Sequence, residues 1–179
     1  MQFHASSVIH FWFTELSPKD WWVKSDSLDN KIKSRFLNAH LAAKNGELSH
    51  WRNTAHGRLA ESIVLDQFSR NIYRDTPQAF SQDSMALVLS QELIANKFDL
   101  ILNPQEKLFA FLPFMHSESV HVHQLAVKIF EKAGLDLDFE LKHKIIIDKF
   151  GRYPHRNSIL NRTSTTEEEE FLKGPNSSF

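Results

Sequence analysis

The stretch HGRLAESIVLDQFSRNIY, residues 56–73, carries the pattern that sets the fold class. Apolar residues recur in it at the spacing of a helix, and one stripe consists of Ala60, Val64, Phe68 and Ile72. The opposite face is also partly apolar, with Leu59, Ile63 and Tyr73 beside the charged pair Asp66 and Arg70. We therefore expect a helix over residues 56–73 that carries charge between apolar neighbours.

Similar helix signals continue on both sides of this stretch, and the alternation typical of strands is hard to find. Asn103, Pro104 and Glu106 combine an N-cap, a first-turn proline and a capping box, so a helix should begin there. Gly46 and Gly134 are expected helix ends. The expected helices cover about residues 6–16 (capped by Ser6 or Ser7), 26–45 (capped by Asp26), 82–96, 103–113, 114–132, 138–149, and a short last one from Thr165 or Thr166.

This pattern predicts one all-α domain over residues 1–173, followed by a frayed C-terminal tail at 174–179. A chain of 179 residues can bury about 70% of its unfolded surface and needs no disulfide or structural metal to stabilise its fold. The 15 Phe and 4 Trp supply a large core, whereas 5 Gly and 6 Pro leave few turns, which favours long elements.

The overall charge excludes several classes of function. The chain has 21 Lys and Arg against 22 Asp and Glu, so its formal net charge is -1. It therefore lacks the excess of positive charge that would bind nucleic acid or an anionic membrane. Cysteine is absent, which removes disulfides and thiolate chemistry and suits a reducing compartment. With neither a leader-like N-terminus nor an 18-residue apolar run, the expected location is the cytoplasm.

Histidines fall on apolar faces of two expected helices. In residues 114–132, His116 and His123 share a face with Val120 and Val127, so burial is expected for both. In residues 138–149, His143 is the only titratable member of an apolar stripe that points towards the following loop. A histidine so placed is either a hydrogen-bonded core residue or a group that exchanges protons.

The loop FGRYPHRN, residues 150–157, concentrates polar groups between a glycine and a proline that end a helix. Such loops aim side chains, and here they are Arg152, His155, Arg156 and Asn157. Arginine suits carboxylate or phosphate recognition. The alternative is that these arginines only tie the loop to helix ends and to Asp66.

Asp66 and Arg70, spaced i, i+4, admit two interpretations. One is an ordinary surface ion pair worth about 0.2–0.5 kcal/mol. The other is a half-buried pair, favoured by the apolar residues on its own face, whose disruption would cost about 3–5 kcal/mol. Asn71 follows directly and extends this polar segment.

Metal and nucleophile chemistry have weaker support. Two Glu-x-x-His pairs, Glu118 with His121 and Glu140 with His143, have the spacing of di-metal bundles, but no matching glutamates mark other helices. Ser117 stands between His116 and Glu118, yet adjacent helical residues diverge by about 100°. We expect no metal site and no cofactor.

Taken together, several blocks of sequence resemble the bacterial DUF924 family of proteins of unknown function. They are FWF at 11–13, LDQFSRN at 65–71, MHSE at 115–118, residues 150–157, ILNR at 159–162, and Ser164-Thr165. The resemblance runs from about residue 8 to 172. It implies a fold like tetratricopeptide-repeat (TPR) arrays, with stacked antiparallel helix pairs, in a cytoplasmic protein without an established activity.

The resemblance also marks site residues. Positions that match the family's polar pattern are Asp66, Arg70, Asn71, His116, Ser117, Glu118, His143, Arg152, His155, Arg156 and Asn157. The chain departs from the pattern at Ser69, where proline is usual, and at Asn161, where glycine is usual. These changes should adjust backbone rigidity rather than remove a functional group.

The leading hypothesis is a polar pocket that binds a small anionic ligand. Arg152 and Arg156 would hold the anion, and Asp66 would orient an arginine or histidine. If the protein is an enzyme, His116 with Glu118 or His143 would handle protons. The competing hypotheses are a peptide- or protein-interaction module whose polar clusters are purely structural, and a metal-binding helical bundle. The oligomeric state is open.

Overall fold

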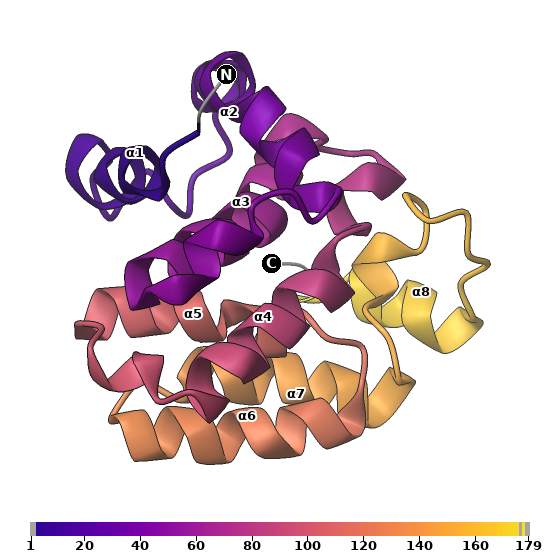
Figure 1. Ribbon diagram of the computed structural model, residues 1–179. Helices are drawn as coiled ribbons and strands as arrows, with labels where there is room; N and C mark the ends of the chain where they lie inside the picture. The colour runs from indigo at the N-terminus through magenta and orange to yellow at the C-terminus, as the bar shows by residue number, and fades with distance from the viewer. Residues whose placement is uncertain (1–2, 176, 178–179) are drawn as a thin grey trace.

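Helix α3 (Ala55–Ile72) lies at the centre of the computed structural model, which describes residues 3–175 and 177 (Figure 1). Helices α1, α2, α4 and α5 pack directly against it, and α6 and α7 pack together beyond α5. The other helices are α1 (Ala5–His10), α2 (Asp26–Lys44), α4 (Asp83–Ala95), α5 (Pro104–Met115), α6 (Val120–Ala133), α7 (Asp138–Phe150) and α8 (Thr166–Leu172). Short turns of 3-10 helix include η3 (Pro77–Phe80) and η5 (Pro154–Arg156), and a π-helical turn, η1 (Phe11–Glu15), extends α1.

The described residues form eight α-helices and no strand, which confirms the predicted all-α domain. The TPR-like stacking implied by the family resemblance stays a prediction. Of the tail expected to be frayed, residues 176, 178 and 179 lie outside the described residues. Ser177 is buried, and its hydroxyl donates to the Leu172 carbonyl (3.2 Å).

The core forms around α3 because this helix is buried along nearly its whole length. Phe68 is fully buried, and its ring lies 4.9 Å from Phe36 of α2, 5.6 Å from Trp12 and 6.1 Å from Phe11, measured between centroids. Aromatic pairs at these distances add to the stabilisation from burial. Residues predicted for both faces of α3, such as Val64 and Phe68 on one and Leu59 and Ile63 on the other, belong to this one core.

The first turn of α3 depends on the absence of a side chain at Gly57. Thr54 caps the helix by accepting the Gly57 N–H (3.0 Å), and the chain before the cap passes very close. A Cβ at Gly57 would lie 1.9 Å from the Trp51 carbonyl oxygen and 2.8 Å from the Thr54 hydroxyl. The backbone would have to move to admit it.

We expect Gly57→Ala to destabilise the protein by about 1–3 kcal/mol, because the added methyl overpacks this contact. A glycine-to-alanine change inside a helix ordinarily stabilises by about 0.5–1 kcal/mol, so the sign is reversed here. Urea unfolding measures the difference. Gly174→Ala is the control, since its Cβ would meet nothing nearer than 3.4 Å, and a stabilised Gly57→Ala would contradict the prediction.

Several predicted helix ends are confirmed, and two caps are wrong. Asn103 and Glu106 form the capping box of α5, and Thr165 forms another on α8 with Glu168. The cap of α2 is Ser25 rather than Asp26, because the Ser25 hydroxyl accepts the Leu28 N–H (3.3 Å). Helix α1 begins at Ala5, before the predicted serine caps, and no side chain caps it.

The predicted helix break at Pro113 is wrong, and it misplaces His116. Helix α5 continues through Pro113 to Met115, and α6 begins only at Val120, capped by Ser119. Proline removes one intrahelical hydrogen bond, and the burial of Phe114 and Met115 in the same turn offsets that loss. His116 therefore ends α5 and shares no helix face with His123.

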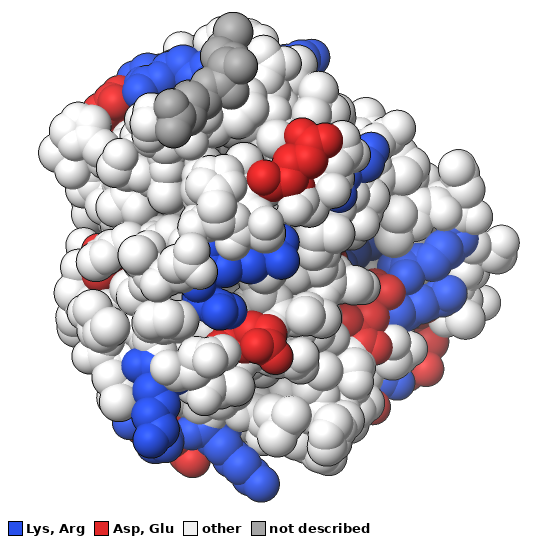
Figure 2. Space-filling view, in the orientation of Figure 1, with Lys and Arg blue, Asp and Glu red and all other residues white. Residues whose placement is uncertain are grey.

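The surface carries charges of both signs. Figure 2 shows Lys and Arg together with Asp and Glu on the face drawn, in small groups set among uncharged side chains. Within the described residues, none of the helices has the length and apolar character needed to cross a membrane.

Candidate functional site

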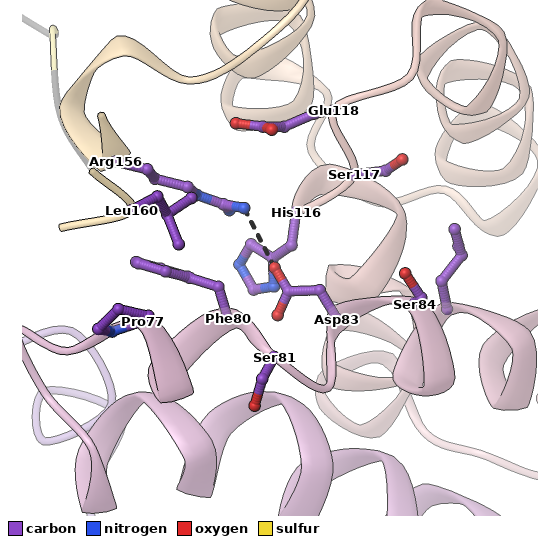
Figure 3. A pocket seen from close by; sticks show the side chains of 11 residues that line it. Pro77, Phe80, Ser81, Asp83, Ser84, His116, Ser117, Glu118, Arg156 and Leu160 are labelled. Carbon is purple, nitrogen blue, oxygen red and sulfur yellow. Dashed lines mark hydrogen bonds and ion pairs between the residues drawn. The ribbon is translucent and has the colours of Figure 1, made fainter. Parts of the chain in front are cut away.

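A cleft of about 280 Å³ lies where η3, the first turn of α4, the loop between α5 and α6, and the loop after α7 meet (Figure 3). Its apolar lining comes from Pro77, Phe80, Leu87 and Leu160. Its polar lining comes from Ser81, Asp83, Ser84, His116, Ser117, Glu118 and Arg156. Three segments that are distant in sequence, residues 77–87, 116–118 and 156–160, thus build one cleft.

A buried Asp66 orients His116 at the floor of the cleft. The Asp66 side chain is 1% exposed, and its Oδ1 lies 2.6 Å from His116 Nδ1. An ionised carboxylate can only accept hydrogen bonds, so Nδ1 carries the proton and donates it. The other ring nitrogen, Nε2, is then an acceptor when the ring is neutral, and the ring lines the cleft.

The surrounding charges keep Asp66 ionised and His116 neutral. Burial raises the pKa of Asp66, but the Arg70 guanidinium and the His116 imidazole outweigh it and hold this pKa well below its ordinary value. Burial, together with Arg70, lowers the pKa of His116 below 6.5, although Asp66 opposes the shift. At neutral pH the pair is an aspartate with a neutral imidazole.

Two arginines meet at Asp83, in the first turn of α4. Arg70 donates to both Asp83 oxygens (2.9 and 3.1 Å) and also lies 3.0 Å from Asp66 Oδ1, which confirms the half-buried interpretation of the Asp66–Arg70 pair. Arg156 donates from Nη1 to Asp83 Oδ2 (3.1 Å). Asp83 therefore fixes the positions of both guanidinium groups beside the cleft.

The Arg156 guanidinium lies between two aromatic rings. Its central carbon lies 4.6 Å from the centroid of Phe80 and 4.6 Å from that of Tyr153. The residue is only 6% exposed, and its Nε has no hydrogen-bond partner among the described residues. An unpartnered buried donor is costly, which makes this group the clearest candidate for a ligand contact.

A network behind the loop between α5 and α6 fixes the segment that carries His116. The Tyr153 hydroxyl donates to the Met115 carbonyl, and His123 Nε2 lies 2.9 Å from the Ser117 carbonyl. His123 Nδ1 in turn lies 2.8 Å from Glu140 Oε1, and burial raises the pKa of Glu140. These contacts hold the backbone on both sides of His116.

Glu118 lies across the cleft from Asp83 and is engaged by the C-terminal loop. It accepts two hydrogen bonds from Arg162 (2.6 and 2.9 Å) and one from the Tyr153 N–H (2.8 Å). Burial raises the pKa of Glu118, but these donors outweigh it and lower the pKa below its ordinary value. Glu118 is therefore ionised, and its carboxylate is held in place by Arg162 and the Tyr153 N–H.

Two further predicted histidines lie near this centre but outside the lining. The His143 ring packs edge-on against Tyr153, with centroids 5.8 Å apart, and its Nδ1–H donates to the Phe139 carbonyl (2.7 Å). The His155 ring lies 5.5 Å from Tyr153 on another side. Burial lowers the pKa of His143 to about 3 and that of His155 to about 4.

The structure places the remaining predicted residues elsewhere. Asn71 donates to Asp29 of α2 (2.8 Å), on the far side of α3 from Arg70. Arg152 donates to both oxygens of Glu168 in α8 (2.6 and 2.8 Å). Asn157 is buried and bonds Glu168 (3.3 Å). These three side chains hold helices and loops in contact with one another and do not line the cleft.

Neither proposed metal spacing forms a site. Glu118 pairs with Arg162, and Glu140 pairs with His123 rather than with a metal-binding neighbour. Within residues 3–175 and 177, no group of three or more His, Asp or Glu side chains could hold a metal ion.

Several functional candidates escaped the sequence analysis. Asp83 and Phe80 position Arg156, and Arg162 engages Glu118. An acidic residue in the first turn of a helix is ordinarily explained by the helix dipole, so Asp83 gave no signal of its own. Arg162 did fall inside a family block, ILNR at 159–162, where its type could have suggested an ion pair.

The two departures from the family pattern have local explanations. The Ser69 hydroxyl donates to the Leu65 carbonyl (2.5 Å) and accepts from His40 Nε2 (2.8 Å) inside the core. Asn161 has φ 53°, in the left-handed region that glycine and asparagine tolerate best. Neither position lines the cleft.

The fold and the cleft define a small all-α protein in which a buried aspartate holds a histidine beside a stacked arginine. The family described as "Bacterial protein of unknown function (DUF924)" matches residues 8–176, and the chain belongs to this family. A solved structure of a protein of unknown function from Agrobacterium tumefaciens is 35% identical, with a TM-score of 0.89, over 95% of this chain and 97% of that one. The comparison with curated proteins gave no match.

Proposed function

We propose that the cleft binds a small organic anion held by Arg156, and that His116 exchanges a proton with it. The observation that carries the proposal is the meeting, in one cleft, of a buried guanidinium with an unpartnered Nε and an imidazole oriented by Asp66. A cavity of about 280 Å³ suits a ligand of few atoms.

The first turn of α4 supports anion binding beside Arg156. Asp83 and Ser84 of this turn line the cleft, and the N-cap residue Gln82 makes no side-chain cap. Unbonded N–H groups at the start of a helix and the helix dipole both favour a negative group. The Asp83 carboxylate would repel an anion, but its negative charge is compensated by the ion pairs with Arg70 and Arg156.

Apolar side chains in the lining suit the apolar part of such a ligand. Phe80, Leu87 and Leu160 present carbon surface to the cleft among the polar groups. A short organic acid combines a charged group with an apolar body in the same way. Inorganic anions would use only the polar side chains.

His116 is placed for general acid–base catalysis. Its Nδ1–H is fixed on Asp66, which leaves Nε2 as the acceptor and stabilises the imidazolium that forms when it takes a proton. Ser117 and Glu118 line the same cleft. We infer proton transfer rather than a covalent intermediate, because His116 is hydrogen-bonded to Asp66 and, among the described residues, to no hydroxyl that could act as a nucleophile.

The competing function is a peptide- or protein-interaction module with structural polar clusters. Asn71, Arg152 and Asn157 favour it in part, because each is committed to holding helices or loops together. The orphaned Arg156 Nε is what this alternative leaves unexplained. Among the residues that the structure describes, no contact favours the metal-binding alternative.

Thermal shift with short carboxylates and phosphorylated metabolites tests the proposal. A ligand at 100 times its dissociation constant should stabilise the protein by about 2.7 kcal/mol. Arg156→Ala should abolish the shift, and Arg156→Lys should weaken it strongly, because lysine keeps the charge but loses the planar stack on Phe80 and Tyr153.

Arg152→Ala is the matched control for this experiment. Arg152 lies in the same loop and also pairs with a carboxylate, but it does not line the cleft, so the ligand shift should persist. A shift that survives in both Arg156 variants would place the ligand elsewhere. A panel without any stabilising anion would overturn the proposed function.

A further inference from the structure

Resting on the proposed function, we propose that the cleft takes up one proton with each anion it binds, and that this proton resides on His116 Nε2. The inference follows from two features of the site. The first is the fixed tautomer of His116, and the second is the exact pairing of the charges around it.

The tautomer leaves a lone pair where an anion would need a donor. Asp66 holds the proton of His116 on Nδ1, so the neutral ring presents the lone pair of Nε2 on its other edge. An anionic oxygen that approaches Nε2 meets repulsion unless that nitrogen is protonated. A protonated Nε2 would instead donate a charge-assisted hydrogen bond.

The charges around His116 are already balanced before an anion arrives. Three guanidinium groups face three carboxylates: Arg70 pairs with Asp66 and Asp83, Arg156 pairs with Asp83, and Arg162 pairs with Glu118. The negative charge of a bound anion would therefore have no positive charge left to balance it. His116 is the lining group able to gain a positive charge near neutral pH, because arginine is already protonated.

The other titratable groups around His116 do not supply this charge. The charged and titratable groups around His116 come from five parts of the chain. They are Asp66 and Arg70 on α3, Asp83 on α4, Glu118 in the loop that also carries His116, Tyr153, His155 and Arg156 in the C-terminal loop, and His143 on α7. Burial lowers the pKa of His143 to about 3 and of His155 to about 4 and raises that of Tyr153. These three groups stay neutral over the range in which His116 responds.

Anion affinity should consequently rise as the pH falls. The bound anion raises the pKa of His116, so one proton is taken up between the pKa of the free protein and that of the complex. Within this window the dissociation constant should increase about tenfold for each unit of pH. Outside the window it should be constant.

Calorimetry with sulfate and short monocarboxylates at pH 7 measures the proton directly. These probes do not titrate near neutral pH, so any proton taken up belongs to the protein. Tris, imidazole and triethanolamine are suitable buffers, because their acid forms are cations, and the chloride concentration is kept equal in all of them so that its competition is constant. The slope of binding enthalpy against buffer ionisation enthalpy should correspond to about one proton per anion.

His116→Asn locates the proton. The asparagine amide can still donate to Asp66 in place of Nδ1–H, but it cannot be protonated, so anion binding should be weaker and independent of pH. His121→Asn is the matched control, since His121 is exposed on α6, and it should behave as the wild type.

The outcomes separate this inference from the proposed function. Binding without proton uptake in the wild type would overturn the inference and leave the proposed function standing. Proton uptake that persists in His116→Asn would place the proton on another group and also overturn it. If neither sulfate nor any carboxylate binds, the proposed function itself falls.

Discussion

The free energy of unfolding should fall steeply as the pH is lowered from 6.5 towards 4. Three buried or partly buried histidines are responsible, because burial lowers the pKa of His40 to about 4, of His155 to about 4 and of His143 to about 3. In the unfolded chain each of them titrates near 6.5.

The sign follows from which state binds more protons. Between pH 6.5 and 4 the unfolded chain has protonated these histidines and the folded protein has not, so acid favours unfolding. Their contribution is complete above about pH 6.5 and is lost progressively below it. For His40 alone, which is 1% exposed, the difference between 6.5 and about 4 corresponds to about 3 kcal/mol.

Urea unfolding at pH 8, 7, 6 and 5 measures this loss. His40→Gln should reduce the dependence on pH, because the amide can still donate to Ser69 but does not titrate. His10→Asn, at an exposed histidine, should leave it unchanged. Carboxylates with lowered pKa values, such as Glu118, lose their contribution only below about pH 4.5. A flat profile between pH 7 and 5 would contradict the prediction.

Asp66→Asn should destabilise the protein by about 3–5 kcal/mol, the cost of breaking a buried ion pair. The Asp66 carboxylate forms an ion pair with Arg70 (3.0 Å) and accepts hydrogen bonds from His116 and Gln67 (2.6 Å each). The neutral amide leaves the Arg70 charge with Asp83 as its remaining partner and cannot accept at both of its atoms. The stability loss is measured by urea unfolding at pH 7.

The exposed pair Lys144–Asp148 provides the comparison. It has the same i, i+4 spacing, but its side chains are 23% and 41% exposed. Asp148→Asn should therefore cost no more than about 0.5 kcal/mol. Equal effects of the two substitutions would mean that the burial of Asp66 contributes nothing.

Much of the fold could be predicted from local sequence. The apolar stripes of α3 and the capping box at Asn103 act within one or two turns, so the sequence contains their cause. Pro113 was misjudged because its local penalty is offset by the burial of Phe114 and Met115, which depends on the rest of the fold. The error moved His116 from the end of one helix into the next.

The site could be predicted only in part. Asp66 and Arg70 stood out because charge lay among apolar residues of one helix. Arg152 and Arg156 looked equivalent in sequence, yet one pairs with Glu168 and the other reaches Asp83, 73 positions earlier. Which of two neighbouring arginines enters a cleft depends on packing between distant segments, and periodicity within a helix carries no information about it.

The stacking of Arg156 between Phe80 and Tyr153 also has a consequence for biosynthesis. The ribosome adds Arg156 long after the aromatic residues of η1, α2 and α3, such as Trp12, Phe36 and Phe68, have emerged. A growing chain can bury those rings early, but its cleft still lacks the guanidinium. A ligand that requires this guanidinium can therefore bind only a chain that has been translated beyond residue 156.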